Sequence, residues 1–63
     1  MKNVKVSELK QGDIFSENLI RPLKSYRVTF MHESYISATG SNFKGGKDFK
    51  KDQEIPVILL KES

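Results

Sequence analysis

The sequence lacks cysteine and tryptophan and contains a single histidine, His32, among its 63 residues. Without cysteine, neither a disulfide framework nor a zinc site with thiolate ligands can reinforce the core. One histidine with scattered carboxylates also matches neither zinc-ligand spacing nor the repeated acidic positions of a calcium loop. So short a chain leaves little room for a substrate cleft. We therefore expect no metal, no cofactor and no small-molecule substrate.

Long hydrophobic runs are missing as well. No apolar stretch approaches the ~20 residues that cross a bilayer, and residues 1–5 lack the apolar stretch of a signal peptide. We therefore expect a cytoplasmic protein with no membrane contact. With 37% hydrophobic and 30% charged residues, the composition is that of one folded domain spanning residues 1–63. A chain this short buries only about 60% of its unfolded surface, so its stability depends on tight packing or on a partner.

The sequence offers no convincing catalytic constellation. His32 lies in an expected turn with Glu33 and Ser34, where side chains point to solvent. Acid–base catalysis needs a preorganised site, which so small a domain rarely supplies. We interpret His32 as a turn residue and expect no enzyme activity.

Alternating apolar residues indicate short strands. Val4 and Val6 alternate with lysines, and residues 7–12 then predict a turn or one helical turn that folds Leu9 onto the core. Gly12 is expected to take a positive φ and release the chain into the next strand. Residues 16–25 predict an extended or irregular connection, because Pro22 disfavours a long helix there.

The middle of the chain predicts a hairpin. Residues 26–31 and 35–39 favour strands, and residues 32–34 form the turn between them. The glycines of residues 40–46 mark a second reversal, so that residues 43–51 are expected to form a loop or a poorly paired hairpin tip.

The last predicted strand, residues 55–60, is apolar without alternation. Such a strand is either buried on both sides or has one face that awaits a partner. Pro56 lacks an amide proton and therefore belongs at a sheet edge or at the start of the strand. We predict an exposed, partner-binding edge made by Ile55, Val57, Ile58, Leu59 and Leu60.

About five short strands with tight connections and no long helix predict an all-β fold. We expect a small five-stranded antiparallel curved sheet or partial barrel, either Src-homology-3-like or a reduced OB-like barrel.

The opening of the chain carries a resemblance. Its pattern resembles the Leu-x-x-Gly-Asp corner of many small β-barrel domains and reads Val4-x-Val6-Ser7-x-Leu9-x-x-Gly12-Asp13-x-Phe15. The whole chain resembles the short uncharacterised proteins encoded by phages and prophages of Gram-positive bacteria. The resemblance implies an accessory protein of a phage or mobile element, acting in the host cytoplasm, and it transfers no catalytic or binding residue.

The charge asymmetry of the chain lies in residues 43–51. This segment holds four lysines and one aspartate, so its formal charge is +3. That equals the net charge of the whole chain, and the remaining residues therefore sum to zero. Lysines can neutralise phosphates while aromatic rings stack on bases, and the candidate nucleic-acid-binding residues are Phe43, Lys44, Lys47, Phe49, Lys50 and Lys51. The same residues equally suit a solvated hairpin tip.

The remaining aromatic residues allow two interpretations. Tyr26, Phe30 and Tyr35 lie on the predicted hairpin beside Arg27, where rings on a sheet face could stack on single-stranded bases. Core packing explains the same rings more simply, and we assign Phe15, Tyr26 and Phe30 to the core.

Two functional hypotheses follow. The first is a small non-catalytic interaction module, a phage or prophage accessory protein that binds a protein partner or itself through its last strand. The second is a nucleic-acid-binding module that uses residues 43–51. We place the first ahead, because a pI near 9.3 with eight acidic residues spread along the chain favours polyanion binding only modestly.

Overall fold

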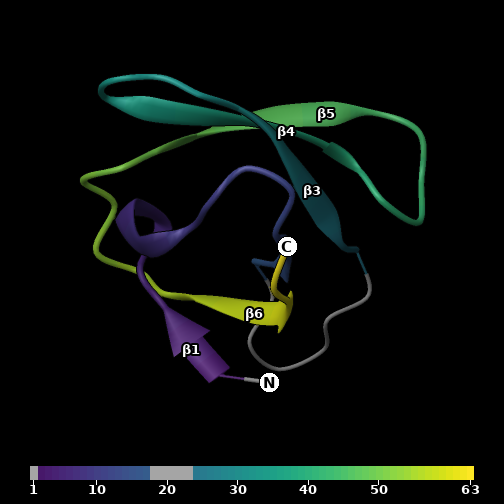
Figure 1. Ribbon diagram of the computed structural model, residues 1–63, viewed down its shortest axis with the longest axis horizontal. Coiled ribbons are helices and arrows are strands. Elements are labelled where there is room, and N and C mark those ends of the chain that lie inside the picture. Colours follow the sequence, from purple (N-terminus) through teal and green to yellow (C-terminus); the bar gives the residue numbers. More distant parts are fainter. Residues whose placement is uncertain (1, 18–23) are drawn as a thin grey trace.

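The computed structural model describes residues 2–17 and 24–63, which form one antiparallel β-sheet (Figure 1). The all-β prediction is confirmed, but the described residues contain six strands instead of five. The predicted connection over residues 16–25 lies mostly outside the described residues. In chain order the elements are β1 (Lys2–Val4), the 3₁₀ helix η1 (Val6–Glu8), β2 (Ile14–Ser16), β3 (Tyr26–Met31), β4 (Tyr35–Gly40), β5 (Gly46–Lys50) and β6 (Val57–Lys61).

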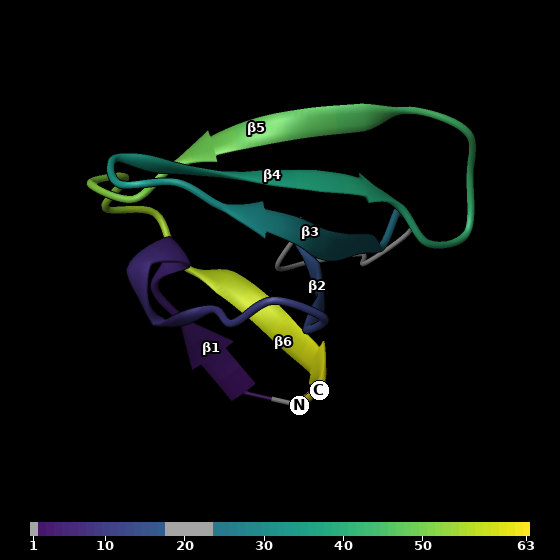
Figure 2. The same ribbon diagram turned by 45° about the horizontal axis from the view of Figure 1, so that its top comes forward.

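The sheet bends over itself without closing. Its strand order is β1-β6-β2-β3-β4-β5, so β1 and β5 are its edges within the described residues. Figure 2 shows β3, β4 and β5 as one layer, with β1 and β6 lying across from them. Side chains from both layers meet between them, and the most deeply buried apolar ones are Val6, Phe15, Val28, Ile36 and Val57. Burial of these side chains on the concave side leaves the opposite face of β3, β4 and β5 free to carry function.

The turn after β1 has the predicted form. The Lys5 amide donates to the Glu8 carboxylate at 2.8 Å across the single turn of η1. Leu9 then folds onto the core and is buried. Gly12 has a φ of +94°, as expected for a residue that reverses the chain in the left-handed region. Gly12 is therefore required at this corner, because residues with a side chain adopt such a positive φ only with strain.

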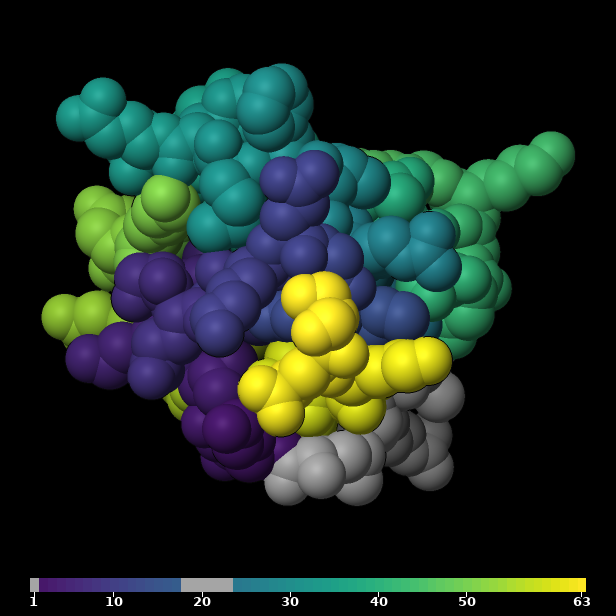
Figure 3. Space-filling model, in the orientation of Figure 1, coloured from purple at the N-terminus to yellow at the C-terminus, as the bar shows by residue number. Residues whose placement is uncertain are grey.

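The aspartate of the same corner is a structural residue. Asp13 is only 4% exposed, and its carboxylate accepts hydrogen bonds from the amides of Lys10 at 2.8 Å and Ser63 at 2.9 Å. Figure 3 shows the C-terminal residues, in yellow, lying against the segment that contains this corner. Asp13 thus joins two segments that are 50 residues apart in the sequence.

A β-bulge in β3 determines the direction of Phe30. Val28 lies opposite Ala38 on β4, but the next pair is Phe30 with Ser37, so Thr29 is an extra residue in β3. The bulge turns Phe30 away from the core, and its side chain is 61% exposed. The assignment of Phe30 to the core was therefore wrong, whereas Phe15 and Tyr26 are buried as predicted.

The predicted partner-binding edge is not an edge. β6 lies between β1 and β2 and pairs with both of them. Val57, Ile58 and Leu59 are buried and Leu60 is half-buried, so the lack of alternation reflects burial on both faces. Pro56 comes directly before the strand, in one of the two positions that its missing amide proton allows. Only Ile55, which precedes the strand, is well exposed, at 67%.

The basic segment is also more ordered than expected. Instead of a loop or a poorly paired hairpin tip, residues 46–50 form β5, which pairs with β4 from Tyr35–Lys50 to Thr39–Gly46. Gly45 has a φ of +136° at the reversal, and Gly40 donates its amide to the Gly45 carbonyl at 2.7 Å. Of the two adjacent glycines, Gly45 is therefore a turn residue and Gly46 is the first residue of the edge strand β5.

Candidate functional site

The four lysines of the basic segment do not form one surface. On β5, Lys47 lies opposite the buried Ala38, whereas Lys50 lies opposite Tyr35 on the outer face of the sheet. Lys44 precedes β5 in the turn, and Lys51 follows it and is half-buried. The side chains are thus divided between two faces and two turns, so the predicted basic loop does not exist as a single phosphate-binding patch.

The two rings of this segment are occupied in packing. Phe49 is only 2% exposed and contacts the rings of Phe15 and Tyr26 edge-on, with centroids 5.1 Å apart in both cases. Phe43 is half-buried, also meets Tyr26 edge-on at 5.2 Å, and lies under the Lys24 ammonium group. The prediction that Phe49 stacks on bases was wrong because the ring is in the core. The Phe43 ring is not open for a base to stack on it either, because Tyr26 and Lys24 contact it.

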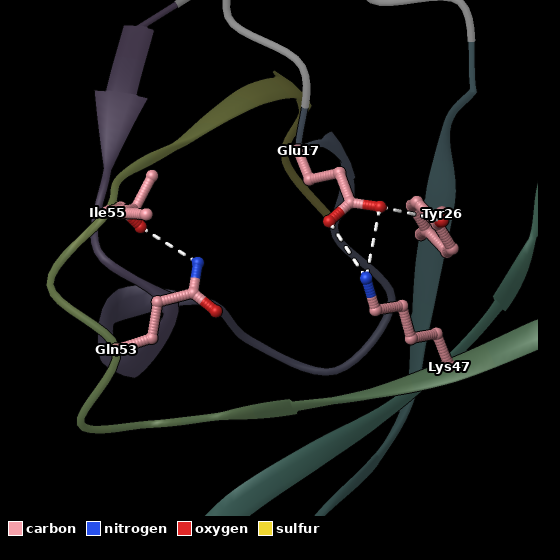
Figure 4. A network of polar contacts seen from close by, with 5 residues as sticks. All are labelled: Glu17, Tyr26, Lys47, Gln53 and Ile55. Carbon is pink, nitrogen blue, oxygen red and sulfur yellow. Dashed lines mark hydrogen bonds and ion pairs between the residues drawn. The ribbon is translucent and has the colours of Figure 1, made fainter.

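Lys47 belongs to a network at the rim of the core (Figure 4). Its ammonium group lies 3.1 Å from the Glu17 carboxylate and 5.2 Å from the centre of the Phe49 ring. The Tyr26 hydroxyl donates to the same carboxylate at 3.1 Å. Burial raises the pKa of the Tyr26 phenol, and the hydrogen bond to Glu17 and its negative charge raise it further. The network connects the end of β2 with β3 and β5, and the Lys47 ammonium group is already engaged in it by an ion pair.

Three aromatic side chains stack at the β3–β4 turn, where Phe30 is exposed and His32 and Tyr35 are half-buried. The His32 imidazole lies between Phe30 and Tyr35, with ring centroids 4.8 Å from the first and 4.1 Å from the second. The His32 and Tyr35 planes are within 15° of parallel, and the His32 Nε2 atom lies 3.1 Å from the Ser37 hydroxyl. We call Phe30, His32 and Tyr35 the ring row. It is fixed by packing and a hydrogen bond, so its rings are preorganised for contact.

Charged and polar side chains adjoin the ring row. On the outer face, cross-strand pairs place Lys50 beside Tyr35 and Asp48 beside Ser37. Arg27 is exposed two positions before the bulge residue, on the same strand as Phe30. Within residues 2–17 and 24–63, no ion pair within 4.0 Å engages these three charged groups. Their charges are therefore available to a ligand.

A groove opens on the β5 side of Tyr35. It is lined by Ser34, Tyr35, Asp48, Lys50 and Asp52. We call it the β5 groove. One aromatic face, one cation and two carboxylates thus border the same small depression, which suits a planar polar group.

Other site classes receive no support from the described residues. Residues 2–17 and 24–63 contain no group of three or more histidines and carboxylates that could hold a metal ion. No helix in that part of the chain is long and apolar enough to cross a membrane. The predicted turn position of His32 is correct, but its side chain stacks between two rings and does not extend freely into solvent.

Comparison of the chain with protein-family models, with curated proteins and with solved structures finds no match. Sequence reasoning named Tyr26, Phe30 and Tyr35 beside Arg27 as a possible stacking face. Tyr26 is buried and does not belong to that face, and His32 was missed. His32 follows Met31, the last residue of β3, and alternation counted from Val28 would have placed Phe30 and His32 on the core side, so the strand pattern gave no signal for this stack.

Proposed function

We propose that this protein is a non-catalytic module that binds single-stranded nucleic acid through the outer face of β3, β4 and β5. The observation that carries the proposal is the ring row, in which Phe30 is exposed and His32 and Tyr35 are half-buried. Phe30 is 61% exposed and continues into the stacked rings of His32 and Tyr35. β-Bulges are often found beside functional sites, where they redirect a side chain, and the bulge in β3 turns Phe30 outward.

Stacking supplies the base-binding part of the proposal. Every nucleobase has a flat face, and each base stacked on an aromatic side chain contributes about 1–3 kcal/mol. The preorganised ring row loses little conformational entropy on binding. Arg27 and Lys50, exposed on the same sheet face, are the cations that would contact phosphates. Lys47, held by Glu17, is left out of the interface.

The test is a titration with fluorescent single-stranded and double-stranded oligonucleotides at low and at physiological salt. We expect micromolar binding that favours the single strand and weakens with salt. Phe30→Ala should weaken it about fivefold or more, in line with the loss of one stacking contact. Phe30→Leu is the matched control, because leucine keeps the exposed apolar surface but has no aromatic face.

A protein partner is the second candidate. Phe30 and Ile55 are the two large apolar side chains that are well exposed among the described residues, and an apolar contact surface suits a protein partner or a second copy. If Phe30→Leu binds oligonucleotides as well as the native protein does, or if no oligonucleotide binds at low salt, the nucleic-acid proposal fails and this candidate takes its place.

We also propose a biological setting and a finer fold. A small binding module without catalytic residues suits a phage or prophage accessory protein that acts in the host cytoplasm. Within the sheet, the five strands β6-β2-β3-β4-β5 are compatible with a Src-homology-3-like partial barrel to which β1 adds a further strand. An experimental structure compared strand by strand with such barrels tests this arrangement.

A further inference from the structure

The stack of rings has a free end over β5. In the strand order β3-β4-β5, Phe30 on β3 and the edge strand β5 lie on opposite sides of β4, which carries Tyr35, and the ring of His32 in the turn lies between those of Phe30 and Tyr35. Lys50 lies opposite Tyr35 on that side, where the β5 groove begins. One face of the Tyr35 ring is covered by His32, so a planar group that enters the groove would extend the stack at its open end.

We propose that the β5 groove binds a nucleobase and prefers bases that carry an exocyclic amino group, such as cytosine and adenine, over thymine and uracil. This inference rests on the function proposed above. It adds the class of base that is recognised and the residues that recognise it.

The preference follows from the polar groups of the groove. The carboxylates of Asp48 and Asp52 only accept hydrogen bonds when ionised. The amino groups of cytosine and adenine donate hydrogen bonds, whereas thymine presents a carbonyl oxygen at the corresponding place on its edge. A carboxylate beside that oxygen repels it, so the groove discriminates by attraction and by repulsion.

Lys50 has a different part in the same groove. Its ammonium group can only donate, and it lies on the outer face next to Tyr35. Among the described residues neither it nor the two carboxylates is engaged in an ion pair. A nucleotide provides acceptors on its phosphate for Lys50 and donors on its base for Asp48, which matches the two signs of charge in the groove.

The test measures fluorescence anisotropy at low salt with labelled single-stranded oligomers of deoxycytidine, deoxyadenosine and deoxythymidine of equal length. The native protein should bind the cytidine and adenosine oligomers at least about fivefold more tightly than the thymidine oligomer. Asp48→Asn should abolish or reverse this ratio, because the asparagine amide can donate to the thymine carbonyl. Glu54→Gln is the matched control, since it removes the same charge from an exposed residue that does not line the groove.

Each outcome decides between the proposals. If the preference for the cytidine and adenosine oligomers is lost in Asp48→Asn and is kept in Glu54→Gln, the result supports the β5 groove as the base-binding site. Equal binding of all three oligomers, or a ratio that changes equally in both variants, overturns the base preference and leaves the stacking function in place. If no oligomer binds the native protein, both proposals fail. Far-ultraviolet circular dichroism of each variant ensures that the comparison is made between folded proteins.

Discussion

Lys47 and Lys50 lie three positions apart on the same strand and face opposite sides of the sheet. Lys47 is opposite Ala38 and pairs with Glu17, while Lys50 is opposite Tyr35 on the outer face. Two lysines of one basic segment therefore have different surroundings and different expected roles. This relationship provides a matched pair of substitutions.

We predict that Lys50→Gln weakens oligonucleotide binding and that Lys47→Gln leaves it nearly unchanged. Removal of one phosphate contact to a single strand lowers the slope of log affinity against log salt by about 0.7. Lys47→Gln should instead reduce the free energy of unfolding by about 0.2–1 kcal/mol, as expected for a partly exposed ion pair. Equal losses of affinity in the two variants would mean that net charge, not the outer face, controls binding.

Two phenylalanines test the bulge in β3. Phe15→Ala should cost about 3–5 kcal/mol of unfolding free energy, because Phe15 is fully buried. Phe30→Ala, at an exposed position, should change it by less than about 0.5 kcal/mol. Urea denaturation followed by circular dichroism measures both. A large cost for Phe30→Ala would place this ring in the core and contradict the register of β3.

Asp13 is predicted to be important for stability despite its charge. Asp13→Ala leaves the Lys10 and Ser63 amides without their carboxylate acceptor, and should cost about 1–3 kcal/mol of unfolding free energy. Asp48→Ala is the control, since Asp48 is exposed and should cost less than about 0.5 kcal/mol. If the two variants are equally stable in denaturation experiments, the hydrogen bonds of the corner contribute little.

Tyr26 is predicted to ionise late. In the variant Tyr35→Phe, Tyr26 is the remaining tyrosine, and its tyrosinate absorbance should appear with a midpoint above the ordinary pKa of 10.0 because burial and Glu17 disfavour the phenolate. Circular dichroism at each pH verifies that the protein is still folded. A midpoint at or below 10.0 in the folded protein would show that the hydroxyl is hydrated and not bonded to Glu17.

The same pKa shift predicts a pH dependence of stability. Since the pKa is higher in the folded than in the unfolded chain, the contribution of Tyr26 is fully present below about pH 10 and is lost as the pH rises through the folded value. The difference in unfolding free energy between the native protein and Tyr26→Phe should therefore shift in favour of the variant above pH 10. A difference that stays constant from pH 8 to 11 is the opposing result.

The parts of the fold that depend on local pattern were predictable. The hairpin of residues 26–31 and 35–39, the buried Leu9 and the positive φ of Gly12 follow from alternation and turn chemistry, which act over a few residues. The position of β6 between β1 and β2 was not predictable, because it depends on pairing with strands more than 40 residues away.

The candidate site was likewise predictable from the sequence only in part. Alternation without a bulge places Phe30 on the same face as Val28, so one extra residue in β3 was enough to make its assignment wrong. The opposite faces of Lys47 and Lys50 follow from their odd spacing once the segment is known to be a strand. Gly45 and Gly46, which precede them, favoured a loop. The strand was therefore not predicted, and neither were the opposite faces of the two lysines.

The two open edges of the sheet affect the solubility of the protein. β1 and β5 each have one neighbour among the described residues, and an unpaired strand is a template on which other chains can aggregate. Both edges carry lysine, at Lys2 on β1 and at Lys47 and Lys50 on β5. An incoming strand would have to desolvate these charges, so the edges resist fibril formation even though the domain leaves its sheet open.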